Sequence, residues 1–438
     1  MHAAFHCLEG CPGAYALTRA IYRCPRCDGL LDVQHDLDAL RDHLDANGWR
    51  DLFDTRRCRG VFPLGSGVWS KHEWVAPELP LSHVVSAGEG HTPMLATREL
   101  GTELGLPRLR IKMCGLSHTG SFKDLGMTVL VSMVRHAIAA GAEIRAVGCA
   151  STGDTSAALA AYGAAAGIPV VVLLPRGKIS TAQLVQPIAC GARVLALDTD
   201  FDGCMAIVQS LAEEGVLYLA NSLNALRIEG QKTVVVEICQ ELGWRAPDWV
   251  VLPSGNLGNG YAMYRGLEMM RDLGLIDRLP RLCLAQAERA NPLFRAYRDG
   301  KKTVTPVRAQ PTLASAIQIG DPVSAPRALR ALRATDGVVA QASEQALADV
   351  AARADRHGLY VCPHTAVALA GVAQLAAQGV MKRDDEVVVV STANGLKFTE
   401  FKVRYHENAL EEHGVRATHA NPPTELPADL DVVREAIG

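Results

Sequence analysis

Lys123 is the side chain in this sequence whose surroundings most favour covalent chemistry. It lies in the segment SHTGSFKDLGM (117–127), directly after Phe122 and where an apolar helix is expected to begin. Partial burial and the positive end of a helix dipole both lower the pKa of a lysine amine, and the neutral amine is the form that makes a Schiff base. The segment therefore predicts a nucleophilic lysine. The alternative is a helix cap followed by a solvated lysine.

Three further polar or glycine-rich segments follow predicted strands and open helices or turns. They are ASTGDTSAA (150–158), PSGNLGNG (253–260) and VVVSTANGLK (388–397). Hydroxyls and backbone N–H groups at the start of a helix can hold an anion, and the glycines of 253–260 allow a phosphate to approach closely. Their spacing does not fit the GxGxxG pattern of dinucleotide-binding loops. Each segment is also explained by an ordinary cap, loop or turn, so a single segment is only a weak signal of anion binding.

Four cysteines near the N-terminus have the spacing of a structural metal site. Cys7 and Cys11 form a Cys-x3-Cys pair, and Cys24 and Cys27 form a Cys-x2-Cys pair. Two such pairs can supply the four thiolates of a tetrahedral zinc site. The alternative is a small β-element whose thiols are reduced and free of metal. Zinc is thus a candidate ligand of this element.

The elements that would position these segments are short β-branched runs that alternate with helical patterns from about residue 108 onward. Strands are predicted at 145–149, 169–174, 193–197, 217–220, 249–252, 281–285 and 386–390, and helices at 126–140, 156–166 and 260–273. This alternation is typical of an α/β protein whose parallel sheets are covered on both faces. Ligands of such folds bind beyond the carboxyl ends of strands, where the polar segments lie.

Composition excludes several classes of protein. The 438 residues suffice for two or three domains, and 44 basic against 47 acidic residues argue against a nucleic acid or an anionic membrane as partner. A small-molecule substrate is expected instead. The apolar stretch 157–175 approaches membrane-spanning length, but Gly163, Gly167 and Pro169 divide it into a helix, a turn and a strand. The start of the sequence has no signal-peptide pattern, so the twelve cysteines are expected to be reduced in the cytoplasm.

Taken together and in this order, the segments resemble the threonine synthases, and more narrowly the plant-type branch of that family. The matching motifs are HTGSFKDLGMTVLVS, CASTGDTSAA, KISTAQLVQPIA, DTDFDGCM, YLANSLNALRIEGQKT, PSGNLGN, ASAIQIGDPVS, CPHTAVAL and STANGLKF. They extend the resemblance over about 22–406. The cysteine quartet is closer to bacterial leaders than to plant ones.

The resemblance implies a fold, a cofactor and a division into domains. The fold is the tryptophan synthase β-like fold, fold type II of the pyridoxal-phosphate enzymes, with two parallel-sheet α/β domains and an N-terminal zinc-ribbon-like element. The element spans 1–85, a large cofactor-binding domain spans 86–144 and 226–410, a small domain spans 145–225, and 411–438 form a tail. The cofactor would be pyridoxal 5'-phosphate, with a structural zinc ion as a further candidate.

The resemblance also assigns roles residue by residue. Lys123 corresponds to the lysine that binds the cofactor covalently and acts as the catalytic base. The cofactor-binding positions are Lys123, Asp154, Gly255, Asn256, Leu257, Gly258, Asn259 and Thr392. The positions for the substrate phosphate are Asn221, Ser222 and Arg227. Two positions depart from the family pattern. Asn394 replaces a histidine that is common in this motif, and Leu125 stands where many bacterial relatives have arginine.

The implied reaction converts O-phospho-L-homoserine and water into L-threonine and phosphate, the last step of threonine biosynthesis, in a homodimer. The nearest alternatives are a serine/threonine dehydratase or a β-replacement synthase of the same fold. An alternative of another class is a non-catalytic zinc-ribbon binding protein. The retained Lys123 and the intact 255–259 loop argue against that last alternative.

Overall fold

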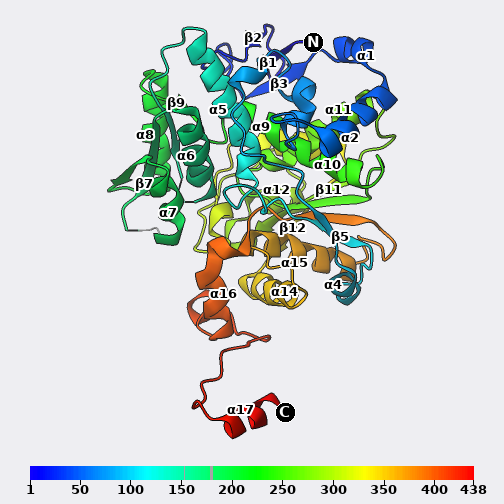
Figure 1. Cartoon of the computed structure of the whole chain (residues 1–438), viewed down its shortest axis with the longest axis vertical. Coiled ribbons are helices and arrows are strands. Elements are labelled where there is room, and N and C mark those ends of the chain that lie inside the picture. Colours follow the sequence, from blue (N-terminus) through cyan, green and yellow to red (C-terminus); the bar gives the residue numbers. More distant parts are fainter. Residues whose placement is uncertain (152, 178–180) are drawn as a thin grey trace.

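The computed structural model describes residues 1–151, 153–177 and 181–438, without the side chains of 181–183. Thr152 of the ASTGDTSAA segment and residues 178–180 of the KISTAQ motif lie outside the described residues. Two parallel sheets and a small N-terminal sheet form the body of the chain, and the C-terminus extends away from it (Figure 1).

The larger of the two parallel sheets has six strands in the order β12-β11-β10-β13-β5-β4. Their bounds are β4 Met94–Ala96, β5 Leu109–Lys112, β10 Trp249–Pro253, β11 Arg281–Ala287, β12 Val338–Ala342 and β13 Val387–Val390. All neighbours are parallel except β4, which runs antiparallel to β5 at the edge. β13 is buried throughout, which explains its uninterrupted valine sequence.

Helices cover both faces of the six-stranded sheet and create two hydrophobic cores. Val388 and Val390 point into the core shared with α5, α9, α10, α11 and α13, whereas Val387 and Val389 point into the core shared with α14 and α15. The helices on the first face are α5 Lys123–Ala139, α9 Leu226–Gln231, α10 Thr233–Glu241, α11 Gly258–Asp272 and α13 Ala325–Ala334. The remaining helices around this sheet are α4 Arg98–Glu103, α12 Pro292–Arg298, α14 Glu344–Arg356, α15 Pro363–Ala377 and α16 Thr399–His406.

The smaller parallel sheet has the strand order β8-β7-β6-β9. Its elements are β6 Val147–Ala150, α6 Asp154–Ala166, β7 Val170–Pro175, α7 Thr181–Ala189, β8 Arg193–Leu197, α8 Phe201–Glu213 and β9 Tyr218–Leu219. Gly167 ends α6 in a left-handed conformation with φ of 67°, so the apolar stretch 157–175 forms the predicted helix, turn and strand. Among the described residues, no helix combines the length and the apolar character that a membrane crossing requires.

The N-terminal element is an antiparallel sheet in the order β2-β1-β3, followed by short helices. Its elements are β1 Ala3–Cys7, β2 Tyr15–Ala16, β3 Leu31–His35, α1 Leu37–His43, α2 Ala46–Arg59 and α3 His72–Val75. The rings of Trp49, Phe53 and Trp74 pack against one another in edge-to-face or tilted pairs and are fully buried in the core that also contains α5 and α11. Apolar packing therefore joins this element to the body of the protein.

The sequence predicted the α/β class, and the two parallel sheets confirm it. All seven predicted strands and all three predicted helices are present, within about three residues at each end. In the six-stranded sheet, β4, β5 and β12 were not predicted as separate strands. Beyond η6 Glu411–His413, the tail carries the exposed helix α17 Leu430–Ile437, far from the body (Figure 1).

The crossing of α5 and α9 gives a test of this packing. A Cβ atom at position 230 would lie 1.6 Å from the carbonyl oxygen of Leu125, so the two helices approach closely because residue 230 is a glycine. We expect Gly230→Ala to lower the free energy of unfolding in urea by roughly 1–3 kcal/mol, the usual cost of overpacking. Ala165→Ser, on an exposed position of α6, is the control and should change it little. Equal stability of the two variants would contradict the close crossing.

Candidate active site

Lys123 is the first residue of α5, and a network of hydrogen bonds fixes the loop that precedes it. The Asp124 carboxylate accepts hydrogen bonds from the Thr119 backbone N–H at 2.7 Å and the Thr119 hydroxyl at 2.5 Å. Burial and, to a smaller extent, the positive charge of Arg227 lower the pKa of Lys123 to about 8, and Asp154 opposes the shift. The amine is therefore partly neutral near physiological pH. This agrees with the expected direction and with the expected contribution of burial, whereas the contribution of Arg227 was not expected.

Thr392 lies beside the start of α5. Its carbonyl oxygen accepts a hydrogen bond from the Phe122 N–H at 2.9 Å, and Ser121 pairs with Ala393 in an antiparallel bridge. The strand β13 ends just before Thr392, so the sheet brings the SHTGSFKD and STANGLK segments together at one edge.

The segment 253–260 forms a cradle of backbone N–H groups between β10 and α11. Within the described chain, no N–H group from Gly255 to Asn259 donates a hydrogen bond. Leu257 has a left-handed conformation with φ of 67°, and the Asn256 carbonyl oxygen accepts a bond from the Ser324 N–H at 3.2 Å. Free N–H groups at the start of a 15-residue helix form a site for a phosphate group. The loop has the chemistry that the cofactor phosphate requires.

The other half of the site comes from the four-stranded sheet and its helices. Asp154 begins α6 and is nearly buried, and its Oδ1 atom lies 3.0 Å from the Lys397 ammonium. The Asn221 side-chain amide pairs with the backbone of Ala150, accepting from its N–H at 3.0 Å and donating to its carbonyl oxygen at 2.8 Å. Asn221 thus has less hydrogen-bonding capacity left for a ligand than the sequence suggested. Ser222 is half-buried next to it.

Arg227 is a buried cation with unused hydrogen-bonding capacity. It is 3% exposed, and its Nη1 atom donates to the Ala220 carbonyl oxygen at 3.1 Å. Its Nε atom has no partner in the described part of the chain. Burial lowers the pKa of Arg227 to about 10, so the guanidinium remains charged at neutral pH. A buried guanidinium with an unpaired donor favours an anionic ligand.

The two departures from the family pattern have structural roles in this chain. The Asn394 side-chain oxygen accepts a hydrogen bond from the Leu396 N–H at 2.9 Å and so caps the short helix η5 Gly395–Phe398. Leu125 is buried in the core at the α5–α9 crossing.

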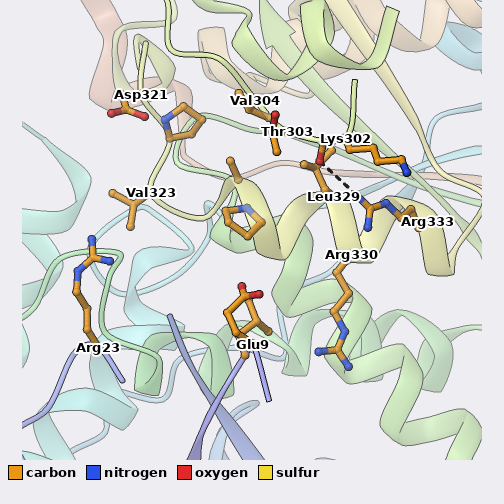
Figure 2. A pocket seen from close by; sticks show the side chains of 14 residues that line it. Glu9, Arg23, Lys302, Thr303, Val304, Asp321, Val323, Leu329, Arg330 and Arg333 are labelled. Carbon is orange, nitrogen blue, oxygen red and sulfur yellow. Dashed lines mark hydrogen bonds between the residues drawn. The ribbon is translucent and has the colours of Figure 1, made fainter. Parts of the chain in front are cut away.

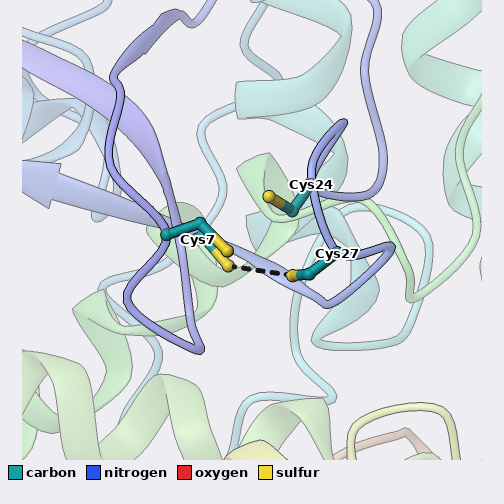
Figure 3. A group of neighbouring side chains, drawn as sticks. Cys7, Cys24 and Cys27 are labelled. Carbon is teal, nitrogen blue, oxygen red and sulfur yellow. Dashed lines mark hydrogen bonds between the residues drawn. The ribbon is translucent and has the colours of Figure 1, made fainter.

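The four predicted cysteine ligands lie together. The Sγ atoms of Cys7, Cys11, Cys24 and Cys27 are all within 4.8 Å of one another. Figure 3 shows that Cys7, Cys24 and Cys27 point toward a common centre from two adjacent loops. All four are free thiols. This arrangement matches the donor set of a tetrahedral zinc ion.

A cavity of about 580 Å³ lies elsewhere, between the N-terminal element and α13 (Figure 2). Arg23, Arg330 and Arg333 line it together with Glu9. None of the predicted site residues is part of its lining. The cavity shares no lining residue with the candidate active site, and its residue Val323 donates a backbone hydrogen bond to the Asn256 side-chain oxygen at 3.4 Å.

A family model described as "Pyridoxal-phosphate dependent enzyme" matches residues 85–393. The chain belongs to this family of pyridoxal-phosphate dependent enzymes. The match includes Lys123, Asp154, the 255–259 cradle and Thr392. The fold is therefore fold type II, as the sequence predicted.

Two sequence relatives and one solved structure show which pyridoxal-phosphate dependent enzymes this chain resembles. The chain is 52% identical over 428 residues to threonine synthase 2, chloroplastic, of Arabidopsis thaliana, covering 96% of this chain and 82% of that protein. It is 37% identical to threonine synthase of Methanocaldococcus jannaschii, covering 92% of this chain and 95% of that protein. The crystal structure of threonine synthase from Escherichia coli has a TM-score of 0.67 at 22% identity and covers 100% of this chain and 99% of its own. That structural likeness shows the fold, and the sequence relatives show that the chain belongs to the threonine synthase family.

Residues that sequence reasoning overlooked are Asp124, Gln186 and Lys397. Gln186 and Lys397 both contact the Thr119 carbonyl oxygen, at 3.1 and 2.9 Å. All three lie inside the motifs that carry the resemblance, but nothing in the spacing of those motifs indicates which residues meet.

The effect of the Arg227 charge on the pKa of Lys123 should be measurable in protein without cofactor. We expect Arg227→Gln to raise the pKa of Lys123 above its value of about 8, because a nearby positive charge that disfavours the ammonium is removed. Acetylation of Lys123 at a series of pH values, followed by mass spectrometry of its peptide, measures this pKa. Lys301 is half-exposed and serves as the internal reference lysine. An unchanged pKa of Lys123 would contradict the proximity of the two side chains.

Proposed function

We propose that this chain is a threonine synthase whose residues act on O-phospho-L-homoserine in the roles described below. The observation in the structure that carries the proposal is the buried guanidinium of Arg227, with an unpaired donor, next to the lowered-pKa amine of Lys123. The high identity to named threonine synthases supports the same reaction. The products are L-threonine and phosphate.

Pyridoxal phosphate, when bound, supplies an electron sink for the carbon atoms of the substrate. We propose that the 255–259 cradle binds the cofactor phosphate, and that Lys123 is its covalent attachment point. The Thr392 hydroxyl would contact the pyridine nitrogen, and Asp154 the phenolic oxygen. The free N–H groups of the cradle and the partly neutral Lys123 support this arrangement.

The amine of Lys123 is suited to move protons at Cα and Cβ of the substrate. A base works best when its pKa lies near the working pH, and the buried Lys123 has a pKa of about 8. Because desolvation and Arg227 keep the amine partly neutral, Lys123 can accept a proton without first losing one to water.

The substrate phosphate is assigned to Arg227, with Ser222 and Asn221 beside it. A guanidinium can form two parallel bonds to a phosphate and stabilise the charge that remains when the phosphate leaves. Because the Asn221 amide already pairs with Ala150, we give Arg227 the main share of this binding. A dehydratase substrate carries no phosphate and offers Arg227 no such partner.

The zinc ion, the dimer and the domain division belong to the same proposal. We propose that Cys7, Cys11, Cys24 and Cys27 bind a structural zinc ion, supported by their clustered thiols. The domain boundaries at 85, 144, 225 and 410 also remain proposals, as do the homodimer and the cytoplasmic location.

Loss of Arg227 should affect a phosphorylated substrate far more than an unphosphorylated one. We expect Arg227→Ala to lower kcat/KM for phosphate release from O-phosphohomoserine by about a hundredfold or more, since charge-assisted bonds contribute roughly 1.5–3 kcal/mol each. The kcat/KM of Arg227→Lys should lie between those of the wild type and Arg227→Ala, because lysine keeps the charge but lacks the planar two-point contact. Arg434→Ala in the exposed helix α17 is the control. The proposal fails if wild-type protein with cofactor releases no phosphate, or deaminates L-threonine or L-serine instead.

The zinc assignment has a direct test. Metal analysis of protein purified without chelator should find about one zinc ion per chain, and Cys24→Ser should lose it, because a structural site needs all four ligands. Cys58→Ser removes an exposed cysteine outside the cluster and should keep the metal. A metal-free wild-type protein would leave only the reduced-thiol interpretation.

A further inference from the structure

Lys397 occupies the centre of a polar cluster beside the candidate active site. Its Nζ atom donates to the Thr119 carbonyl oxygen at 2.9 Å and to the Gln186 Oε1 atom at 2.8 Å, and it lies 3.0 Å from the Asp154 Oδ1 atom. The side chain is 17% exposed. Three acceptors around one ammonium use all three of its N–H groups.

The three acceptors come from the two parallel-sheet units. Lys397 follows β13, and Thr119 precedes α5, so both belong with the six-stranded sheet. Asp154 begins α6 and Gln186 lies in α7, on the helices of the four-stranded sheet. Gln186 also donates from Nε2 to the Thr119 carbonyl oxygen at 3.1 Å. The cluster thus ties the two units together at the point where Asp154 comes close to Lys123.

The surrounding backbone is shaped to hold this lysine. Gly120 has φ of 80°, and a Cβ atom there would lie 3.0 Å from Lys397 Cδ, so glycine leaves room for the lysine stem. The Asn394 side chain caps the short helix that carries Lys397. These features fix the ammonium before any ligand binds.

We propose that Lys397 is a positioning residue, a latch that holds the four-stranded-sheet unit against the six-stranded one and aligns Asp154 beside Lys123. The catalytic part of this proposal rests on the proposed function, through the role of Asp154. Lys397 itself acts through Asp154, Gln186 and Thr119. Loss of its ammonium would leave a nearly buried carboxylate unpaired and free the two units to separate at this point.

The latch can be tested in protein without cofactor by amide hydrogen exchange. Lys397→Met keeps the length of the side chain and removes its charge, and Gln186→Leu removes the second partner. We expect each to speed exchange in 117–121 and in α7 by about tenfold, as expected for loss of a charge-assisted hydrogen bond. The double variant should exchange no faster than Lys397→Met alone, because both substitutions break the same tie. The control Lys301→Met replaces a half-exposed lysine whose side chain does not join this cluster.

Steady-state kinetics with pyridoxal phosphate and O-phosphohomoserine test the catalytic consequence. We expect Lys397→Met to lower kcat by about tenfold or more, with a smaller change in KM, because alignment is lost while the phosphate contacts remain. Lys397→Arg retains a cation and should restore part of the loss. Lys301→Met should behave as wild type.

The outcomes separate the latch from the proposed function. If amide hydrogen exchange in 117–121 and α7 is unchanged in both Lys397→Met and Gln186→Leu, the latch is overturned. Faster exchange with wild-type kcat overturns its role in positioning Asp154. If wild-type protein itself releases no phosphate, the proposed function fails, and the exchange data alone then decide whether Lys397 joins the two units.

Discussion

The constraint on which the site depends is the burial of two positive charges, Lys123 and Arg227, at the crossing of α5 and α9. Removing charges from water costs free energy. Burial therefore lowers the pKa of both residues. The amine of Lys123 responds by becoming partly neutral, which makes it a base. The guanidinium of Arg227 stays charged and keeps an unpaired donor, which favours a phosphorylated ligand. In the proposed function, one electrostatic arrangement thus prepares both the base and the phosphate site. The glycine at position 230 allows the helices that carry them to approach.

Buried polar contacts from the N-terminal element hold the helices of this arrangement in place. His35 on β3 lies 2.6 Å from the Glu229 carboxylate on α9, two residues beyond Arg227. Asp32, also on β3, accepts a hydrogen bond from the Tyr261 hydroxyl at 2.8 Å, on the helix that begins at the phosphate cradle. The element that carries the cysteine cluster therefore contacts α9, which carries Arg227, and α11, which begins at the cradle. A zinc ion there would affect the site only indirectly, by stabilising the fold of the element that holds these helices in place.

The sequence allowed prediction of those features that depend on local pattern. Valine-rich runs predicted the buried strands, and Gly163, Gly167 and Pro169 correctly indicated that 157–175 is a helix, a turn and a strand. The lowered pKa of Lys123 and the contribution of burial to it were expected, but the contribution of Arg227 arises from packing between segments far apart in the sequence. The pairing of Asn221 with Ala150 and of Lys397 with Asp154 and Gln186 could not be predicted for the same reason. These contacts join segments that meet only in the folded chain, and no periodicity or motif spacing encodes them.

We propose above all that Arg227 binds the phosphate of the substrate while Lys123 acts on its carbon atoms. The most direct measurement is a crystal structure of the protein with pyridoxal phosphate and a phosphonate analogue of O-phosphohomoserine, which cannot lose its phosphonate group. We expect phosphonate oxygens within hydrogen-bonding distance of the Arg227 guanidinium, including its Nε atom, and the analogue's Cα next to Lys123. A phosphonate held elsewhere, with Arg227 bonded only to the Ala220 carbonyl oxygen, would contradict this proposal.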